Sequence, residues 1–266
     1  MFYNEDCITG AQKHLKDNSI DLIVCDPPFG INGHRLNKHY NRDENNVLDG
    51  YVDVPENEYA EFSRQWINEA ERVLRPGGSI YIVSGYSNLR HILNALSDTN
   101  LKEVNHLIWK YNFGVYTSKK YISSHYHILY CIKKGGHVTF NKNAFYADSK
   151  KTAQGGSINY LDREDVWIIN REYKRRQMKN KNELPKSLLG KIIRYSSNPD
   201  DLVCDFFLGG FSTAKVAIGL GRKACGFEIN KNAFDYQIRE MIKIKPDELL
   251  SELQRQNNMN FRESKE

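Results

Sequence analysis

The sequence predicts an α/β fold, in which a doubly wound and mostly parallel sheet carries helices on both faces. Short apolar runs, rich in β-branched and aliphatic residues, recur along the 266 residues and are typical of buried parallel strands. Segments with helical periodicity lie between these runs. Such alternation is typical of domains whose helices cover both faces of one sheet.

Five runs are expected to form buried parallel strands, namely residues 20–25, 79–83, 127–132, 201–207 and 223–228.

The clearest expected helix begins near Tyr59 and continues to Leu74. Its apolar residues are spaced by three or four, as expected for one buried face of a helix. Pro76, Gly77 and Gly78 follow it and act as a stop signal.

The regular alternation is interrupted between about residues 137 and 181, where the chain is polar and rich in Lys, Asn and Gly. We expect an insertion there, which divides a single domain into halves at 1–136 and 182–245. Residues 246–266 are expected to form a charged tail that begins as a short helix. A chain of 266 residues is long enough for one domain with such an insertion.

Composition narrows the class of protein further. The five cysteines are odd in number and widely scattered, which predicts reduced, buried thiols without disulfides or a zinc site. The sequence shows neither a targeting segment nor a long apolar run, so we expect a cytoplasmic protein with no membrane segment. The formal charge of +5 permits a nucleic-acid partner without demanding one.

Basic residues gather in one part of the insertion. They are Arg171, Lys174, Arg175, Arg176 and Lys179. The segment alone leaves two interpretations equally open: a solvated basic loop, or a surface that contacts phosphates.

A candidate catalytic loop directly follows the first strand, with the sequence Asp26-Pro27-Pro28-Phe29. Ligands bind at the carboxyl ends of the strands in a doubly wound sheet, so this loop lies where chemistry is expected. The prolines fix an extended backbone and remove two donors, which leaves a carboxylate, carbonyl oxygens and an aromatic face. Such a loop could grip an amine through two acceptors while Phe29 stacks on an extruded base. The alternative is a rigid turn without a catalytic role.

A second candidate site lies late in the chain, where strand, glycine turn, helix and strand follow one another. Gly209 and Gly210 allow close approach of the backbone to a ligand, and Ser212 or Thr213 can cap the next helix. Glu228 follows the second strand and can accept hydrogen bonds from ribose hydroxyls. The G-x-G-x-x-G pattern of dinucleotide sites is absent, which argues against a dehydrogenase.

The loop at Asp26 resembles the catalytic motif of the amino-group DNA methyltransferases, an acidic or amide residue followed by Pro-Pro and an aromatic. Adenine-N6 members carry Asp or Asn at the first position and cytosine-N4 members usually carry Ser, so Asp26 favours adenine. The second site resembles the family's cofactor motif Asp-Pro-Phe-x-Gly-Ser-Gly-Thr. The matching positions are Asp205, Phe207, Gly209, Ser212 and Thr213.

Three residues depart from that cofactor motif. Phe206 replaces Pro, Gly210 replaces Ser, and Phe211 replaces the second Gly, so that a side chain stands where the family has bare backbone. Leu184 also replaces the Lys of the family's His-x-Thr-x-Lys-Pro segment. At the amino terminus, Asp6 and Cys7 resemble the family's element that contacts the cofactor adenine, although Asp6 alone would be interpreted as a helix cap.

The catalytic loop precedes the cofactor loop, an order that is similar to the circularly permuted β-group of this family. The resemblance covers most of residues 1–240 and implies the S-adenosylmethionine-dependent methyltransferase fold, with residues 137–181 as target-recognition region. It also implies transfer of a methyl group from S-adenosylmethionine to a flipped adenine in double-stranded DNA. The alternatives are a cytosine-N4 enzyme and a nucleic-acid-binding protein that has lost catalysis. A homodimer and a cognate restriction endonuclease are partners that the resemblance leaves open.

Overall fold

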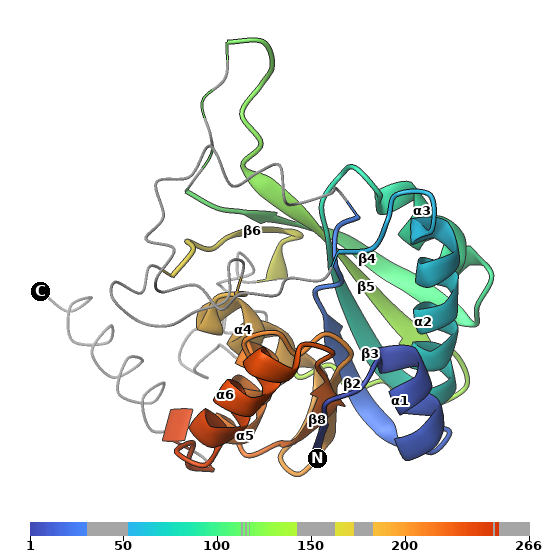
Figure 1. Cartoon of the computed structure of the whole chain (residues 1–266), viewed down its shortest axis with the longest axis vertical. Helices are drawn as coiled ribbons and strands as arrows, with labels where there is room; N and C mark the ends of the chain where they lie inside the picture. Colours follow the sequence, from blue (N-terminus) through green and yellow to red (C-terminus); the bar gives the residue numbers. More distant parts are fainter. Residues whose placement is uncertain are drawn as a thin grey trace, which may run out of the picture.

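The computed structural model describes residues 1–30, 53–112, 114, 116, 118–142, 163–172, 183–246 and 248–249. Within them one eight-stranded sheet has the order β1-β8-β7-β2-β3-β5-β4-β6 (Figure 1). The strands are β1 (Phe2–Tyr3), β2 (Ile20–Cys25), β3 (Leu74–Ser84), β4 (Leu101–Lys110), β5 (His125–Lys133), β6 (Val166–Ile168), β7 (Leu202–Asp205) and β8 (Lys223–Phe227). The helices are α1 (Cys7–His14), α2 (Tyr59–Val73), α3 (Leu89–Ser97), α4 (Lys186–Ser196), α5 (Ser212–Gly219) and α6 (Lys231–Met241).

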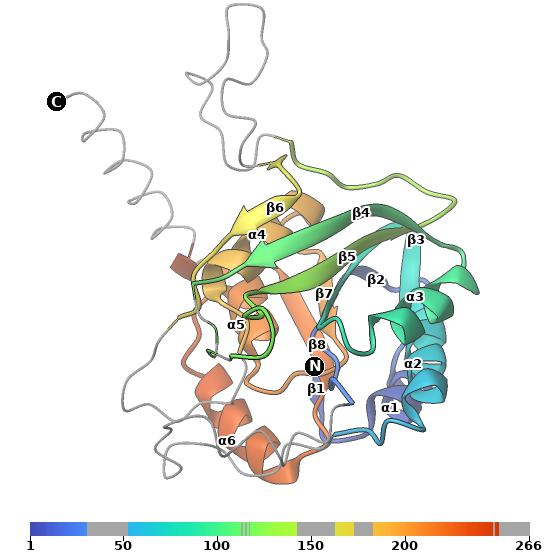
Figure 2. The same ribbon diagram turned by 90° about the horizontal axis from the view of Figure 1, so that it is seen from above.

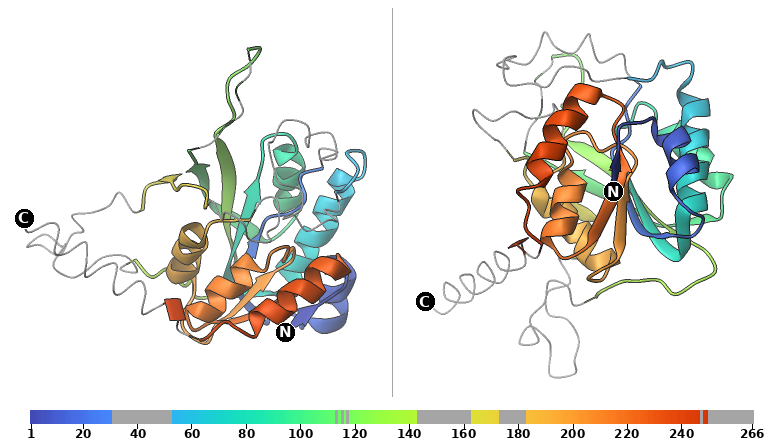
Figure 3. Two further views of the ribbon diagram at one scale, coloured as in Figure 1. Left: turned by 60° about the vertical axis from the view of Figure 1, so that its left-hand side comes forward. Right: turned by 60° about the horizontal axis from the view of Figure 1, so that its bottom comes forward.

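Helices cover both faces of the sheet, as the alternation of apolar segments predicts. Helices α1, α2 and α3 pack on one face, while α4, α5 and α6 pack on the other (Figure 3). Successive residues of β2 enter opposite cores: Ile23 packs with the first group and Val24 with the second. This strand is therefore buried on both sides, which explains its continuous apolar sequence. The prediction of an α/β fold with a mostly parallel sheet is confirmed.

The expectation that residues 127–132 form a parallel strand is wrong. They belong to β5, which pairs antiparallel with β3 on one side and with β4 on the other (Figure 2). Strand β5 is the next element after β4 along the chain, and such a direct connection between paired strands reverses the chain. Because β5 is buried on both faces at its centre, its composition is the same as that of a parallel strand.

Three further strands, β1, β4 and β6, were not expected from the sequence, and β1 has only two residues. The first half of β4 is exposed and polar, so it lacks the apolar run by which the other strands are recognised. Strand β6 pairs in parallel with the end of β4 and lies inside the polar region at 137–181. Part of that region therefore extends the sheet. The division at 137 and 181 stays a prediction, because residues 143–162 and 173–182 lie outside the described part.

The order of strands creates a switch point between β2 and β7. From β2 the chain crosses through α2 to β3, on one side, whereas β7 crosses through α5 to β8 on the other side. Ligands of open α/β sheets bind at such a point, next to the carboxyl ends of the strands. In the described residues no helix is long and apolar enough to cross a membrane.

Candidate active site

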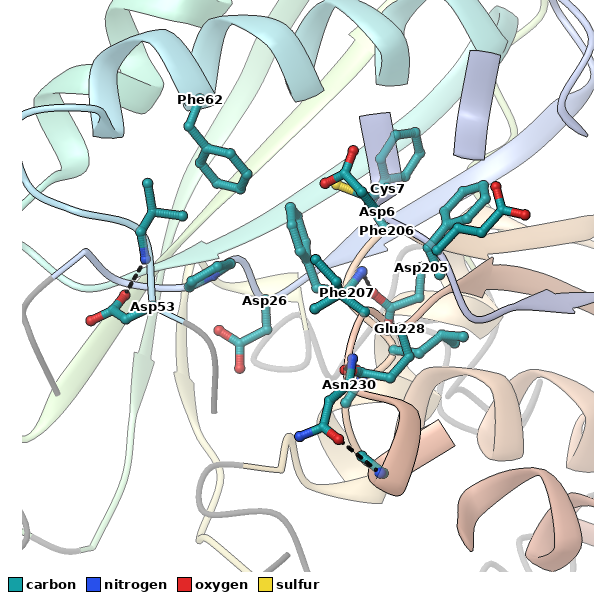
Figure 4. Close-up of a pocket in the computed structure, with 18 of the residues that line it drawn as sticks. Asp6, Cys7, Asp26, Asp53, Phe62, Asp205, Phe206, Phe207, Glu228 and Asn230 are labelled. Atoms are coloured by element: carbon teal, nitrogen blue, oxygen red, sulfur yellow. Dashed lines mark hydrogen bonds between the residues drawn. The ribbon is translucent and has the colours of Figure 1, made fainter. Parts of the chain in front are cut away.

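Four neighbouring strands, β1, β8, β7 and β2, end at the same edge of the sheet. Each carries an acidic residue there: Asp6 after β1, Glu228 after β8, Asp205 at the end of β7 and Asp26 after β2. These carboxylates surround one cavity, and Figure 4 shows them approaching it from their separate strands. The two halves of the sequence, nearly 200 residues apart, thus form a single site.

The cavity has a volume of about 660 Å³. Carboxylates dominate its polar lining, and the described part of that lining contains no Lys, Arg or His. Its acidic residues are Glu5, Asp6, Asp26, Asp53, Glu58, Glu61, Glu183, Asp205 and Glu228. A lining of this charge favours a cationic ligand and disfavours the pyrophosphate of a dinucleotide.

The loop after β2 is held in place by two polar side chains. Asn88 donates from Nδ2 to the carbonyl oxygens of Phe29, at 2.7 Å, and Gly30, at 3.2 Å. Asp53 accepts the amide of Gly30 at 2.8 Å. Gly30 has a φ of 63°, and a Cβ at this position would collide with the ring of Tyr59, so glycine is required where the loop turns.

Asp26 carries the most unusual group of the site. Its Oδ1 atom is buried and has no hydrogen-bond partner among the described residues. Burial, together with the nearby charge of Asp205, raises the pKa of this carboxyl to about 8, although Arg171 partly opposes the shift. An acceptor without a partner inside a protein is unfavourable, so this atom has a free hydrogen-bonding capacity that a donor could fill.

The loop after β7 is closed by Glu228. One carboxylate oxygen accepts the amide of Gly209 at 2.8 Å, and the other accepts the amide of Asn230 at 2.7 Å. Burial raises the pKa of Glu228. Asp205 accepts the amide of Phe207 at 2.9 Å, and burial raises the pKa of Asp205 to about 6. Both carboxylates therefore shape the turn as well as lining the cavity.

The side chain of Phe211 turns away from the cavity. Phe211 adopts a left-handed φ of 58°, a conformation that explains why glycine stands at this position in the motif. Its ring is fully buried and packs against Phe2, at 5.2 Å between centroids, and Phe234, at 5.9 Å. The substitution therefore leaves the cavity open. Gly210 lies beside Glu183, whose carboxylate would clash with an added Cβ.

Asp6 and Cys7 lie at the amino-terminal end of the site. Asp6 caps α1, because its Oδ1 accepts the amides of Ile8 and Thr9, each at 3.0 Å. The helix-cap interpretation is thus confirmed, and the same residue also lines the cavity. Cys7 lines it too, and burial raises the pKa of its thiol well above the usual range. All five cysteines are buried and free.

The structure gathers the catalytic and cofactor residues predicted from sequence around the cavity or directly beside it. Pro27 is buried and Pro28 lines the cavity, while Phe29 lies outside the lining and stacks on Tyr126, with ring centroids 5.4 Å apart. Phe207, Gly209, Gly210, Ser212 and Thr213 all line the cavity.

Sequence reasoning missed several contributors, among them Asn88, Asp53 and Glu183. Asn88 follows the carboxyl end of β3, so the rule that places sites at strand ends could have found it. Asp53 and Glu183 have no comparable signal, because only folding brings them to the cavity.

The predicted phosphate contacts divide into two groups. The guanidinium of Arg171 lies over the rings of Tyr111, Tyr126 and Trp109, and its Nε atom is buried, while its contact with phosphate stays a prediction. Lys174, Arg175, Arg176 and Lys179 lie outside the described residues, so their role stays a prediction.

The sequence is similar to those of known DNA methyltransferases. M.HpaI of Haemophilus parainfluenzae, a type II methyltransferase, is 31% identical over 228 residues, which cover 83% of this chain and 68% of M.HpaI. The DNA adenine methyltransferase YhdJ of Escherichia coli K12 is 31% identical over 245 residues, which cover 86% of this chain and 78% of YhdJ.

Solved structures show the same architecture. A putative DNA modification methylase of Thermus thermophilus, TTHA0409, in complex with S-adenosyl-L-methionine, has a TM-score of 0.66 and 18% identity, with 92% of this chain and 94% of TTHA0409 covered. The model of the N6/N4 DNA methylases matches residues 20–240, a span that contains the Asp26 loop, the Asp205 loop and Glu228. The chain therefore belongs to the family of N6/N4 DNA methylases.

Proposed function

We propose that this protein transfers a methyl group from S-adenosylmethionine to N6 of an adenine that is flipped out of double-stranded DNA. The observation that carries the proposal is the buried and unpaired Oδ1 of Asp26, at the carboxyl end of β2 and on the wall of the acidic cavity, with no partner in the described part of the chain. A base amine supplies the hydrogen that this acceptor lacks.

The charge of the cavity lining fits S-adenosylmethionine. The methyl donor carries a positive sulfonium and an ammonium group, and the described lining supplies carboxylates without an opposing base. Asp6 and Cys7 at one end, Asp205 with the Gly209-Gly210 turn, and Glu228 at the end of β8 would hold it. When bound, S-adenosylmethionine supplies an electrophilic methyl group.

The residues around Asp26 prepare the amine for attack. The lone pair of a base amine is delocalised into the ring, and an acceptor that grips one of its hydrogens favours a more tetrahedral nitrogen. Asp26 is that acceptor, and the carbonyl of Pro27 is the second acceptor that the sequence predicts. Phe29, held through its carbonyl by Asn88, offers an aromatic face for the flipped base. Cys7 stays a neutral thiol, so no covalent intermediate on cysteine is expected.

Two lines of support favour adenine over cytosine. Asp stands at the first position of the catalytic motif, which resembles the adenine enzymes, and the relative YhdJ is a DNA adenine methyltransferase. Cytosine N4 is the second candidate, because its amine has the same chemistry. A binding protein without catalysis is disfavoured, since the unpaired carboxyl of Asp26 destabilises a protein that makes no use of it.

The test incubates the purified protein with unmodified DNA and methyl-labelled S-adenosylmethionine, and then identifies the labelled nucleoside by mass spectrometry. We expect N6-methyladenine. N4-methylcytosine would keep the mechanism and replace the base, whereas absence of label despite cofactor binding would contradict the function. Asp26→Ala should abolish transfer and leave cofactor affinity largely intact, while Asp235→Ala, on α6 and paired with Lys231, should behave like the unaltered protein.

No observation on the described residues supports the other partners or the cellular location that this function suggests. Homodimer formation, a cognate restriction endonuclease and a cytoplasmic location stay predictions, as do the phosphate contacts in the basic segment.

A further inference from the structure

An aromatic cluster of Phe29, Trp109, Tyr111 and Tyr126 lies next to the catalytic loop. Phe29 stacks on Tyr126 with an angle of 14° between the rings, and Tyr126 in turn contacts Tyr111, at 5.4 Å, and Trp109, at 5.6 Å. Phe29 follows β2, whereas the other three rings come from β4, β5 and the start of their connecting loop. The cluster thus joins the catalytic loop to the antiparallel part of the sheet.

Arg171 covers this cluster. The central carbon of its guanidinium lies 4.5 Å from the centroid of Tyr111, 5.3 Å from Tyr126 and 5.7 Å from Trp109, all within the range of cation–π contacts.

The backbone leading to Arg171 is fixed by the sheet. Ile169 accepts the indole N–H of Trp109 at 2.8 Å and donates its own amide to Lys110 at 3.0 Å. Only one residue, Asn170, separates this anchor from Arg171, so the backbone of Arg171 is held close to the end of β6.

Two buried polar atoms here have no partner among the described residues. One is the acceptor Oδ1 of Asp26, and the other is the donor Nε of Arg171. Their hydrogen-bond characters are opposite, and contacts link them: Arg171 lies over Tyr126, and Tyr126 stacks on Phe29 of the loop that begins at Asp26. A ligand that satisfies both must present a donor next to an acceptor.

The amino edges of adenine and cytosine present that pair. In each base an exocyclic amine donates, and a ring nitrogen next to it accepts. At the position of that amine, guanine and thymine carry a carbonyl beside a ring N–H, which would set an acceptor against Asp26 and a donor against Arg171; the separate amine of guanine lies on its minor-groove edge. The two atoms therefore discriminate between the classes of base by the direction of their hydrogen bonds.

We propose that Arg171 is a specificity-determining residue, which donates from Nε to the ring nitrogen next to the target amine while Asp26 accepts a hydrogen of that amine. The inference rests on the proposed methyl transfer and deepens it, because it names the edge of the base that the site reads. Arg171 also lowers the pKa of Asp26 and thereby favours its ionised form, which is the stronger hydrogen-bond acceptor for the amine.

The test uses base analogues that lack one ring nitrogen. The methylated site is first located by sequencing DNA treated with the unaltered protein. Duplexes then carry adenine, 1-deazaadenine or 7-deazaadenine at that site, or cytosine and 3-deazacytosine for a cytosine target. Single-turnover rates are measured with saturating protein and S-adenosylmethionine for the unaltered protein, for Arg171→Met, and for the control Arg239→Met on the exposed face of α6.

We expect the analogue that lacks the contacted nitrogen to react about ten- to a hundredfold more slowly than the natural base in the unaltered protein and in Arg239→Met. Arg171→Met should lower the rate on the natural base and reduce the ratio of the rates on base and analogue. The analogues change amine reactivity and base pairing equally in every variant, so only the fall of this ratio in Arg171→Met reports the contact.

Two results would overturn the inference. Equal rates on all analogues with the unaltered protein would show that no ring nitrogen is read, and this measurement does not depend on the variant. A rate ratio in Arg171→Met as large as that of the unaltered protein, with cofactor affinity preserved as evidence of folding, would assign the recognition to another residue. If the unaltered protein methylates neither adenine nor cytosine, the proposed function fails first and the inference fails with it.

Discussion

The protonation of Asp26 should control the rate of methyl transfer. Its pKa of about 8, set mainly by burial, means that the carboxyl is largely neutral at pH 6 and largely ionised at pH 9. The ionised form is the stronger acceptor, and it offsets the positive charge that develops on the amine nitrogen. The ionised fraction rises from about 1% at pH 6 to about 90% at pH 9, so kcat/KM for DNA should rise roughly 90-fold over this range.

The assay measures initial rates of labelled methyl transfer to a short duplex between pH 6 and 9. Saturating S-adenosylmethionine is required, because Asp205 titrates near pH 6 and would add its own effect on cofactor binding. Asp26→Asn keeps an acceptor oxygen but has no ionisation, so its profile should lose the step near pH 8. A flat profile for the unaltered protein, or the same step in Asp26→Asn, would refute the role of this carboxyl.

Three further predictions concern stability, the cofactor and the catalytic loop. Because the pKa of Asp26 is raised, the folded state keeps a proton that the unfolded state releases, so the stability of the protein falls as pH rises from about 4 to 8. Asp26→Asn lacks this loss, so the Tm of the variant minus the Tm of the unaltered protein should grow by a few degrees per pH unit over this range. A Tm difference that stays constant with pH would contradict the raised pKa. Glu228→Ala leaves the amides of Gly209 and Asn230 unpaired and should weaken cofactor binding about ten- to a hundredfold by calorimetry; an unchanged Kd would remove Glu228 from the site. Asn88→Ala releases the carbonyls of Phe29 and Gly30, so kcat should fall about tenfold with cofactor affinity unchanged, and a normal kcat would show that the loop is held without it.

The two loops that line the cavity, after β2 and after β7, could be located from the sequence because their signals are local. An apolar run followed by Asp26-Pro27-Pro28-Phe29 places a carboxylate at the end of a strand, and such a strand end is where an α/β sheet binds ligands. The turn before α5 and the acid after β8 follow the same rule. These features depend on a few adjacent residues, so no knowledge of distant contacts is needed.

The direction of β5 and the existence of β6 depend on tertiary contacts. A strand buried on both faces has the same composition whether its neighbours run parallel or antiparallel, so the apolar run at 127–132 could not reveal its direction. Strand β6 has only three residues, and it forms because β4 offers it an edge. Strand pairing is decided between segments, whereas periodicity reports only one segment at a time.

The state of the individual side chains was also decided by the fold. The sequence determined that Asp26 stands at a strand end and that Phe211 replaces a glycine. Only the tertiary structure buries Oδ1 without a partner in the described residues and raises the pKa of that carboxyl, and only packing against Phe2 and Phe234 takes the ring of Phe211 out of the cavity. Arg171 changes most, from one charge in a basic segment to a guanidinium held on aromatic rings beside the catalytic loop. The local sequence determines which chemical groups are present. Whether a group is buried, and whether it finds a hydrogen-bond partner, depends on contacts between residues far apart in the chain, and only folding brings those residues together.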